Sequence, residues 1–539
     1  MNRVRVSPTG LVCLVAAYLA LTGNLRFFRG VVEAFPPGED NLGFVLSTGL
    51  VLTSVFALLL LPFNQRLLRK PVLVVTLMVT AVLAAFMDTY GVAIDADMVR
   101  NVFETDREEA AGLLSTPLVL RVLLLGALPA WLVLRIHHAP VSLRRHLTAS
   151  AVLALCASLI IIASWLSYGS HYASLVRQHR PLRYYTNPTY PLYATVKYLR
   201  QRQAGHAAHT DLLRTIAQDA QIPTSDTEHE LVIVIVRETA RADHFSLNGY
   251  ERRTNPRLET IDNLVSFDDV ASCGTATARS VPCMFAQEDR TSFDPDRSKN
   301  TENALDILAR TGVEVLWRDN NSGSKGVADR VAYEDFSTPK RNPLCNPECR
   351  DEGMLQDLQD FIDVQTGDAI IVLHQMGSHG PEYDRRYPDP FRVFTPVCAR
   401  ADLSACEPET IRNAYDNTIL YTDHFIAEAI ALLQRNTQRF ETALLYVSDH
   451  GESLGEHGIY LHGLPYAFAP EAQTHVAAMI WVEDAFDVAP ASIRENQDRP
   501  LTHASVFHTL LDLFEIESAS LNPGLSLLRR AAGRSARAQ

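Results

Sequence analysis

The hydrophobic pattern divides the chain into two unlike parts, and long apolar runs dominate the first. Five such runs lie at residues 10–29, 41–63, 71–90, 117–136 and 147–168. Each has roughly the 20 residues that a helix needs to cross a bilayer. The first run is too long for a cleaved signal peptide, and four more follow it. This pattern predicts a membrane domain of five transmembrane helices over residues 1–169.

Basic residues predict how this domain lies in the membrane. They cluster before the first run, between the second and third, and between the fourth and fifth. These residues are Arg3, Arg5, Arg66, Arg69, Lys70, Arg135, Arg144 and Arg145. Loops rich in arginine and lysine stay in the cytoplasm, and the remaining loops are acidic or mixed. We therefore expect a cytoplasmic N-terminus, and an odd number of spans places everything after residue 168 on the far side of the membrane.

From residue 230 onward, short apolar runs alternate with helical periodicity. The runs typical of buried strands are residues 231–236, 313–317, 369–373, 443–447 and 476–482. The segments with helical periodicity are residues 304–310, 353–362, 411–433 and 503–514. Such alternation favours a largely parallel sheet covered by helices on both faces. We predict an α/β/α domain over residues 230–525.

Residues 170–229 connect the two parts. The segment up to residue 199 is rich in tyrosine and arginine, which suits the interface between lipid headgroups and water. Residues 201–229 are polar and predict a flexible tether. We therefore expect an interfacial bridging helix and a linker at 170–229. At the other end of the chain, we expect a disordered tail at 526–539.

Charge and cysteine content narrow the function classes. The chain has 539 residues and a formal net charge of -13, which argues against a nucleic-acid partner. Six of the eight cysteines form three close pairs, and none has the spacing of a structural zinc site. The pairs are Cys273 with Cys283, Cys345 with Cys349, and Cys398 with Cys406. Three local pairs favour disulfides and an oxidising compartment; the alternative is free thiols in a cytosolic enzyme.

Side chains that bind metals follow two of the predicted strands. Asp449 and His450 come after the run 443–447, and Glu238 comes after the run 231–236. Ligands of open parallel sheets collect beyond the carboxyl ends of the strands, and carboxylates with an imidazole suit a zinc-type cation. A lone Asp-His pair is more often an ordinary turn, but donors from several strand ends favour a metal centre.

A candidate nucleophile and several histidines reach the same edge. Thr277 lies among small residues between Cys273 and Cys283. A threonine hydroxyl becomes a nucleophile when a metal or a base draws off its proton, whereas an isolated threonine would cap a helix. The histidines that follow the later strands are His374, His379, His457 and His462. Together these segments predict a metal centre with a nucleophile.

One loop of the membrane domain has a regular polar spacing. Asn101, Thr105 and Glu109 are four residues apart, which places them on one face of a short helix. A solvated helical face explains this spacing, and so does a site for a phospholipid headgroup beside the bilayer. The spacing itself favours the solvated face.

Several strings of residues carry a family resemblance. They are E-T-A-R-A-D-H from Glu238, S-C-G-T-A-T-A from Ser272, W-R-D-N-N-S from Trp317, H-Q-M-G-S-H-G-P from His374, and S-D-H-G-E-S-L-G-E-H-G from Ser448. In this order they closely resemble the lipid A phosphoethanolamine transferases, which include the mobile colistin-resistance enzymes and belong to the alkaline phosphatase/sulfatase superfamily. The resemblance covers nearly the whole chain, including the five apolar runs.

The resemblance implies a function and its residues. It implies zinc held by Glu238, Thr277, Asp449 and His450, with Thr277 as the nucleophile. Lys325, His379 and His462 would surround the substrate phosphate, and Asn101, Thr105 and Glu109 would touch the donor lipid. It also supports the pairing of the six cysteines. The implied protein is a monomer of the bacterial inner membrane with a periplasmic catalytic domain.

The implied reaction moves phosphoethanolamine from phosphatidylethanolamine to a phosphate of lipid A through a phosphoethanolamine–threonine ester. The added amine would lower sensitivity to cationic peptides such as polymyxins. Alternative acceptors are core sugars of lipopolysaccharide or periplasmic glucans. A membrane-anchored phosphatase or sulfatase is another alternative, and a non-catalytic receptor would need no metal ligands.

The chain departs from the family pattern at four positions near these motifs. Arg237 replaces an expected glycine, Ala276 an expected serine, Arg279 an expected tyrosine and His457 an expected asparagine. None of these changes removes a proposed ligand. We expect the two arginines to change the preference for the acceptor.

Overall fold

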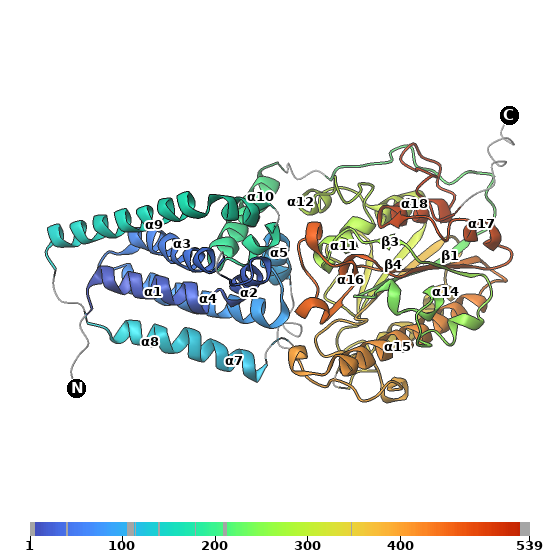
Figure 1. The fold of residues 1–539 in the computed structure, drawn as a ribbon. Helices are drawn as coiled ribbons and strands as arrows, with labels where there is room; N and C mark the ends of the chain where they lie inside the picture. Colours follow the sequence, from blue (N-terminus) through green and yellow to red (C-terminus); the bar gives the residue numbers. More distant parts are fainter. Residues whose placement is uncertain are drawn as a thin grey trace. The chain divides into compact units, whose positions relative to one another are not determined.

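The chain folds into two compact units, Met1–Val99 with Leu114–Tyr198, and Arg100–Leu113 with Leu199–Gln539 (Figure 1). The computed structural model describes eight stretches of these units. They are residues 6–38, 41–104, 113, 115–137, 141–177, 179–208, 213–346 and 348–528.

The first unit is a bundle of apolar helices. Its elements are α1 (Pro8–Thr22), α2 (Leu25–Ala34), α3 (Leu42–Leu60) with η1 (Leu61–Phe63), α4 (Arg69–Tyr90), α7 (Thr116–Val122), η2 (Leu123–Ala127), α8 (Leu128–Arg135), α9 (Leu143–Arg177), η3 (Arg180–Tyr185) and α10 (Thr189–Ala208). The helix α5 (Ala96–Glu104) follows α4. Among the described residues, four helices are long and apolar enough to cross a membrane, and a fifth span exists if the bent pair α1–α2 counts as one.

The predicted first span is not one straight helix, because the chain bends by 60° between α1 and α2. The break lies at Gly23 and Asn24, where Asn24 Nδ2 donates to the carbonyls of Leu19 and Asn187. Asn187 in turn donates from Nδ2 to the carbonyls of Gly23 and Thr80. These bonds satisfy backbone groups that a bilayer leaves without water. Hydropathy alone does not detect such a break.

The fourth span contains a π-helical turn, η2, immediately before Pro129. Proline has no N–H to donate to the carbonyl four residues earlier, which is that of Leu125. Tyr18 of α1 donates its hydroxyl to this carbonyl at 2.9 Å. Nearby, a Cβ on Gly126 would lie 2.9 Å from the Ala81 Cβ of α4, so glycine permits close helix packing here.

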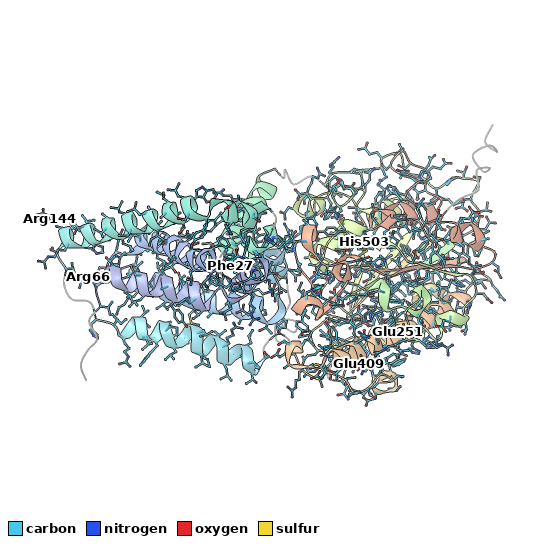
Figure 2. All side chains as sticks on the ribbon, viewed as in Figure 1. Phe27, Arg66, Arg144, Glu251, Glu409 and His503 are labelled. Carbon is cyan, nitrogen blue, oxygen red and sulfur yellow. A yellow bond between two sulfur atoms is a disulfide. The ribbon has the colours of Figure 1, made fainter. Side chains whose placement is uncertain are left out.

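The distribution of charge within the bundle agrees with the predicted orientation. Figure 2 shows Arg66 and Arg144 at the same end of the bundle and Phe27 towards the other end. The outward face of α9 is apolar, with Leu155, Leu159 and others exposed, as a lipid-facing helix requires. The orientation itself stays a prediction.

The connector is more ordered than the sequence predicts. The helix α9 continues past a kink at Tyr168 to Arg177, and α10 covers part of the predicted tether. Residues 213–229 pack on the second unit: Arg214 pairs with Thr301, Gln221 pairs with Glu517, and Ala217 is buried in the core. The prediction of a flexible tether is therefore wrong for this segment, because its apolar residues find a surface that their own spacing does not reveal.

The second unit is built on a seven-stranded sheet in the order β2-β10-β7-β1-β6-β4-β5. Its strands are β1 (Glu230–Arg237), β2 (Leu264–Phe267), β4 (Glu314–Asp319), β5 (Ala332–Asp335), β6 (Ala369–Gln375), β7 (Glu441–Ser448) and β10 (Ala478–Val482). Only β10 runs antiparallel to its neighbours among these strands. Two small ladders pair β3 (Val270–Ala271) with β11 (Leu501–Thr502), and β8 (Ser453–Leu454) with β9 (Tyr460–Leu461). The predicted, largely parallel sheet is confirmed.

Helices cover both faces of the sheet. They are α11 (Thr277–Met284), α12 (Pro295–Ser298), α13 (Ala304–Thr311), α14 (Leu358–Asp363), α15 (Pro408–Gln434), α16 (Glu471–Thr474), α17 (Pro490–Arg494) and α18 (Ala504–Leu513). Figure 1 shows α14 and α15 on one side and α11 and α18 on the other. Alternate residues of β1, Val232, Val234 and Val236, share a core cluster with α11, α13 and α18. A strand buried on both faces explains the unbroken apolar run of β1.

Differences from the predicted elements have local causes. The predicted helix 353–362 splits into η7 (Asp351–Leu355) and α14, because Asp357 adopts a left-handed φ of 54°. The edge strand β5 was not predicted, since it is only four residues long, mostly exposed, and lacks a buried apolar run. At the other end, Leu527 and Leu528 are buried in the core. The predicted tail therefore begins too early; its residues 529–539 lie outside the described part of the chain.

Candidate metal centre and active site

The ends of β1 and β7 bring three of the predicted metal ligands together. The strands are paired in register from Glu230 with Glu441 to Arg237 with Ser448, so Glu238 and Asp449 leave the sheet at the same edge. The Asp449 carboxylate is fixed by its Oδ1, which accepts from the backbone N–H groups of Thr239 at 3.1 Å and His450 at 2.7 Å. Glu238, Asp449 and His450 are all fully buried.

Thr277 joins this cluster from the first residue of α11. Its Oγ1 donates to Glu238 Oε2 at 2.7 Å and lies 3.3 Å from His450 Nε2. The Cys273–Cys283 disulfide bridges the segment that carries it. The structure therefore places the predicted nucleophile within hydrogen-bond distance of two predicted metal ligands.

The separations of His450 from its acidic neighbours suit a cation at this point. The His450 Nε2 lies 3.2 Å from Glu238 Oε1 and 3.5 Å from Asp449 Oδ2. Four donors around zinc, with bonds of about 2.0–2.2 Å, stand about 3.3–3.6 Å apart. Two of the oxygens that would complete the shell, Glu238 Oε1 and Asp449 Oδ2, are buried without a hydrogen-bond partner among the described atoms. Buried carboxylate oxygens without donors are costly, and a cation at this point would satisfy both.

Electrostatics in the cluster also suit a cation. Burial alone would raise the pKa of Glu238, but the adjacent His450 imidazole holds it well below its usual range. Burial and the charge of Glu238 raise the pKa of Asp449. Burial alone would lower the pKa of His450, but the charges of Asp449 and Glu238 raise it to about 10. The buried carboxylates thus favour a positive charge at this point, which a bound cation would supply.

Two further predicted residues border this cluster. The ligating atoms of Glu238, His450 and His462 all lie within 4.8 Å of one another. His462 Nδ1 lies 3.0 Å from Glu452 Oε2, and the fully buried Glu452 also accepts from Tyr383. A carboxylate on Nδ1 leaves Nε2 directed at the site. The rings of His379 and His462 have centroids 5.8 Å apart.

Lys325 and the loop residues are less directly placed. The Lys325 ammonium donates to the carbonyl and hydroxyl of Ser322 at 2.9 and 2.8 Å, and in the described part of the chain it forms no hydrogen bond with Glu238 or His450. Asn101 lies in α5. Thr105 and Glu109 lie outside the described residues, so their proposed role remains a prediction.

Asn321 was not predicted from the sequence, yet it contacts the candidate ligand Glu238 directly. Its Nδ2 donates to Glu238 Oε2 at 3.0 Å and to the Gln375 carbonyl at 2.9 Å. Asp319 orients this loop, since its Oδ1 accepts from the N–H groups of Asn321 and Gly323. Asp319 also bonds the buried His374, one of the histidines singled out by its position. The sequence did contain a signal for this residue, because Asn320 and Asn321 follow a predicted strand whose carboxyl end lies at the same edge of the sheet as Glu238.

His503 is a second missed residue, and Figure 2 labels it in the interior of the second unit. Its Nδ1 accepts from the Cys273 N–H at 3.1 Å, and its Nε2 donates to the Ser448 carbonyl at 2.9 Å. Burial lowers the pKa of His503 to about 3, so the ring is neutral. One imidazole therefore links the segment before Thr277 to the strand before Asp449.

The departures from the family pattern have different consequences. The Arg237 side chain is fully buried, so any effect on the acceptor has to be indirect, and the predicted change in acceptor preference stays a prediction. Arg279 stands two residues after Thr277 on α11, a spacing that does not share a helix face, and it donates to the Arg290 carbonyl. His457 is exposed with a left-handed φ of 53°, a conformation that asparagine tolerates well.

The three cysteine pairs are disulfides, as predicted. They join Cys273 to Cys283, Cys345 to Cys349, and Cys398 to Cys406. Cross-links of this kind persist in oxidising compartments.

The fold and the site together define the class of protein. It has an α/β domain whose sheet edge carries candidate metal ligands beside a hydroxyl group, and this domain is attached to apolar helices. The sequence profile of the sulfatase family matches residues 230–516, and that of phosphoethanolamine transferase EptA/EptB matches residues 52–203.

Individual relatives are similar to this chain over almost its full length. The chain is 42% identical to phosphatidylethanolamine transferase Mcr-1 of Escherichia coli, covering 98% of both chains. It is 37% identical to phosphoethanolamine transferase EptA of Escherichia coli strain K12, covering 96% of both. The integral membrane lipooligosaccharide phosphoethanolamine transferase A of Neisseria meningitidis has a TM-score of 0.93 at 31% identity, covering 98% of this chain and 100% of that one. The chain belongs to the phosphoethanolamine transferase family.

Proposed function

We propose that the protein transfers phosphoethanolamine from phosphatidylethanolamine to a phosphate of lipid A, with Thr277 as the covalent carrier. The observation that carries this proposal is the position of the Thr277 hydroxyl, 2.7 Å from Glu238 Oε2 and 3.3 Å from His450 Nε2. Relatives at 42% and 37% identity bear the names phosphatidylethanolamine transferase and phosphoethanolamine transferase. A more distant relative, 33% identical over 300 residues, is named Kdo(2)-lipid A phosphoethanolamine 7''-transferase.

Zinc is the proposed cofactor, held by Glu238, Thr277, Asp449 and His450, with one ion at this site. The mixture of carboxylate, imidazole and hydroxyl donors supports this choice. When bound, zinc supplies Lewis acidity that lowers the pKa of the threonine hydroxyl and offsets negative charge on the phosphoryl oxygens. Because His462 lies beside this cluster, the proposal also allows a second ion.

In the first step, the Thr277 oxygen attacks the phosphorus of the donor lipid. The Thr277 O–H points at Glu238 Oε2, which takes the proton as the new oxygen–phosphorus bond forms. The bond from phosphorus to the diacylglycerol oxygen breaks, and His462 or His379 protonates the departing oxygen. Glu452 holds His462 through Nδ1, so Nε2 is the atom that gives the proton. Lys325 adds a positive charge for the phosphoryl oxygens.

In the second step, a phosphate oxygen of lipid A attacks the phosphoethanolamine group on Thr277. The bond to the Thr277 oxygen breaks, Glu238 returns the proton to that oxygen, and the proton of the attacking phosphate group passes to the histidine that protonated diacylglycerol. A covalent carrier of this kind divides one exchange between two lipids into two displacements at one site. The added amine reduces the negative charge of the outer-membrane surface, so cationic peptides such as polymyxins bind it less strongly.

The proposed setting is the bacterial inner membrane, with a cytoplasmic N-terminus and a periplasmic catalytic domain. Three disulfides and the shared position of Arg66 and Arg144 in the bundle support this orientation. Asn101, Thr105 and Glu109 are the proposed contacts for the donor lipid. Because Glu238, Thr277, Asp449 and His450 come from one chain, the proposal requires only a monomer.

Mass spectrometry of lipid A from cells with and without the active protein tests the proposal. We expect lipid A that carries added phosphoethanolamine only in cells with the active protein. Unmodified lipid A beside modified core sugar would instead favour transfer to the oligosaccharide. Release of free ethanolamine phosphate without any modified lipid would indicate a phosphatase.

A further inference from the structure

The turn that delivers His379 packs directly against the backbone of Glu238. Its first residue is Met376, whose carbonyl accepts from the His379 N–H at 3.2 Å. The second residue, Gly377, has a left-handed φ of 58°, and a Cβ there would lie 2.6 Å from the Glu238 carbonyl oxygen. The third, Ser378, donates its N–H to the same carbonyl at 3.2 Å. The position of His379 is therefore coupled to that of the ligand-bearing strand end.

Two buried groups of opposite charge hold this turn at consecutive residues. Asp351 accepts from the Met376 N–H at 2.8 Å and from the Gly377 N–H at 3.2 Å. Arg237 donates from Nη2 to the Ser378 hydroxyl at 2.6 Å. Arg237 is completely buried and Asp351 is 4% exposed. The Asp351 carboxylate therefore holds the turn at Met376 and Gly377, and the Arg237 guanidinium holds it at Ser378.

The remaining donors of Arg237 bond to the residue that follows β1 and to α15. Its Nη1 donates to the Glu238 carbonyl at 2.9 Å, and its Nε donates to the Thr422 hydroxyl at 2.6 Å. Among the described residues, no carboxylate lies within ion-pair distance of this guanidinium. A buried charge without an ion pair is unfavourable unless hydrogen bonds and a nearby opposite charge compensate.

The nearby opposite charge is that of Asp351. Burial raises the pKa of Asp351, and the charge of Arg237 acts against that rise, together with the bonds from Asn320, Met376 and Gly377. Both groups hold the same turn, Asp351 through the Met376 and Gly377 N–H groups and Arg237 through the Ser378 hydroxyl. Neither side chain has surface left for a substrate, so any effect on the reaction must pass through the turn.

We infer that Arg237 and Asp351 are positioning residues that act as a pair, through the turn 376–379, to fix the His379 ring beside His462 at the edge of the metal centre. This inference rests on the proposed function, in which His379 faces the substrate. Fixed side-chain geometry matters because a displacement of about 1 Å costs roughly 100-fold in rate.

The experiment measures epistasis in the full-length protein, reconstituted in nanodiscs that contain phosphatidylethanolamine. Mass spectrometry follows the rate constant for forming the phosphoethanolamine adduct on Thr277, and chelator competition measures zinc affinity. The variants are Arg237→Met, Asp351→Asn, His379→Ala and the double variant of Arg237 with His379. Arg330→Met is the matched control, because Arg330 pairs with Asp306 and belongs to no part of the proposed site.

Arg237→Met and Asp351→Asn should each slow adduct formation about 10- to 100-fold, while zinc affinity and the control stay within about twofold. In the His379→Ala background, Arg237→Met should add less than about a twofold effect, since residues that act through one another are not additive. Effects of Arg237→Met and His379→Ala that multiply would overturn the inference, and so would an unchanged rate for Arg237→Met.

A second variant keeps the inference testable if Arg237→Met misfolds. Ser378→Ala removes the hydroxyl that Arg237 holds and leaves both charges in place, and it should reproduce the same epistasis with His379→Ala. If Arg237→Met does not fold, this variant decides the outcome by the same criteria. Wild-type protein that forms no adduct on Thr277 would overturn the proposed function itself, and this inference with it.

Discussion

Replacing Asn321 with alanine should weaken zinc binding without touching a ligand. The substitution removes one donor from the buried Glu238 carboxylate, at 3.0 Å, and one from the Gln375 carbonyl, at 2.9 Å. Glu238 then keeps Thr277 as its hydrogen-bond donor, and its carboxylate is free to rotate away from the geometry that three other donors require. The four ligands themselves remain.

The magnitude follows from the type of bond that is lost. A hydrogen bond to a charged group contributes about 1.5–3 kcal/mol. Loss of a partner that orients a metal ligand typically weakens metal binding about 10- to 100-fold, which corresponds to about 1.4–2.7 kcal/mol. Both routes give the same range, so we expect the Kd for zinc to rise about 10- to 100-fold in Asn321→Ala.

Competition with a chelator of known affinity measures this Kd on the full-length protein. Asn436→Ala is the matched control, since Asn436 is equally buried and donates to Gln359 and to the Leu432 carbonyl near the end of α15. The control should lower Tm without changing the Kd by more than about twofold. A Kd for Asn321→Ala that equals the wild-type value would refute the reasoning, because Glu238 would then need no second support.

Three further outcomes are expected. His503→Asn and His503→Gln each retain one of the two backbone bonds of the ring, so each should slow adduct formation less than His503→Leu does; equal rates for all three would contradict a bridging role. Burial and nearby carboxylates raise the pKa of Glu230 to about 9, so the folded state binds this proton more tightly and stability should fall as pH rises from about 4.5 to about 9. Glu230→Gln should therefore raise Tm at pH 8 and flatten that fall, and an unchanged Tm profile would count against it. Replacing Cys273 and Cys283 with serine should cost about 2–3 kcal/mol in unfolding free energy, measured by denaturant titration, whereas wild-type stability would show that the cross-link is dispensable.

The metal cluster could be predicted because it depends on topology. Parallel strands place their carboxyl ends at one edge, so Glu238 after one strand and Asp449 with His450 after another had to meet if the sheet was parallel. Thr277 was found by its motif and by the flanking cysteines. The register of β1 with β7 shows why Glu238 and Asp449 lie close together, which the sequence could only imply.

Residues whose role depends on distant partners could not be predicted. A charged residue at a strand end reads as exposed, yet Arg237 is buried because Thr422, 185 residues later, provides an acceptor on α15. His503 looks like the start of an ordinary amphipathic helix until its ring is seen between Cys273 and Ser448. The bend after α1 was hidden for the same reason, since Asn187 lies 163 residues from Asn24.

Mass spectrometry of the trapped covalent intermediate shows whether Thr277 carries phosphoethanolamine between the two lipids. Full-length protein incubated with phosphatidylethanolamine, without an acceptor, should carry one phosphoethanolamine group on the peptide that contains Thr277. Addition of lipid A should remove it, and Thr277→Ala should never acquire it. A phosphoethanolamine adduct that persists in Thr277→Ala would contradict the account.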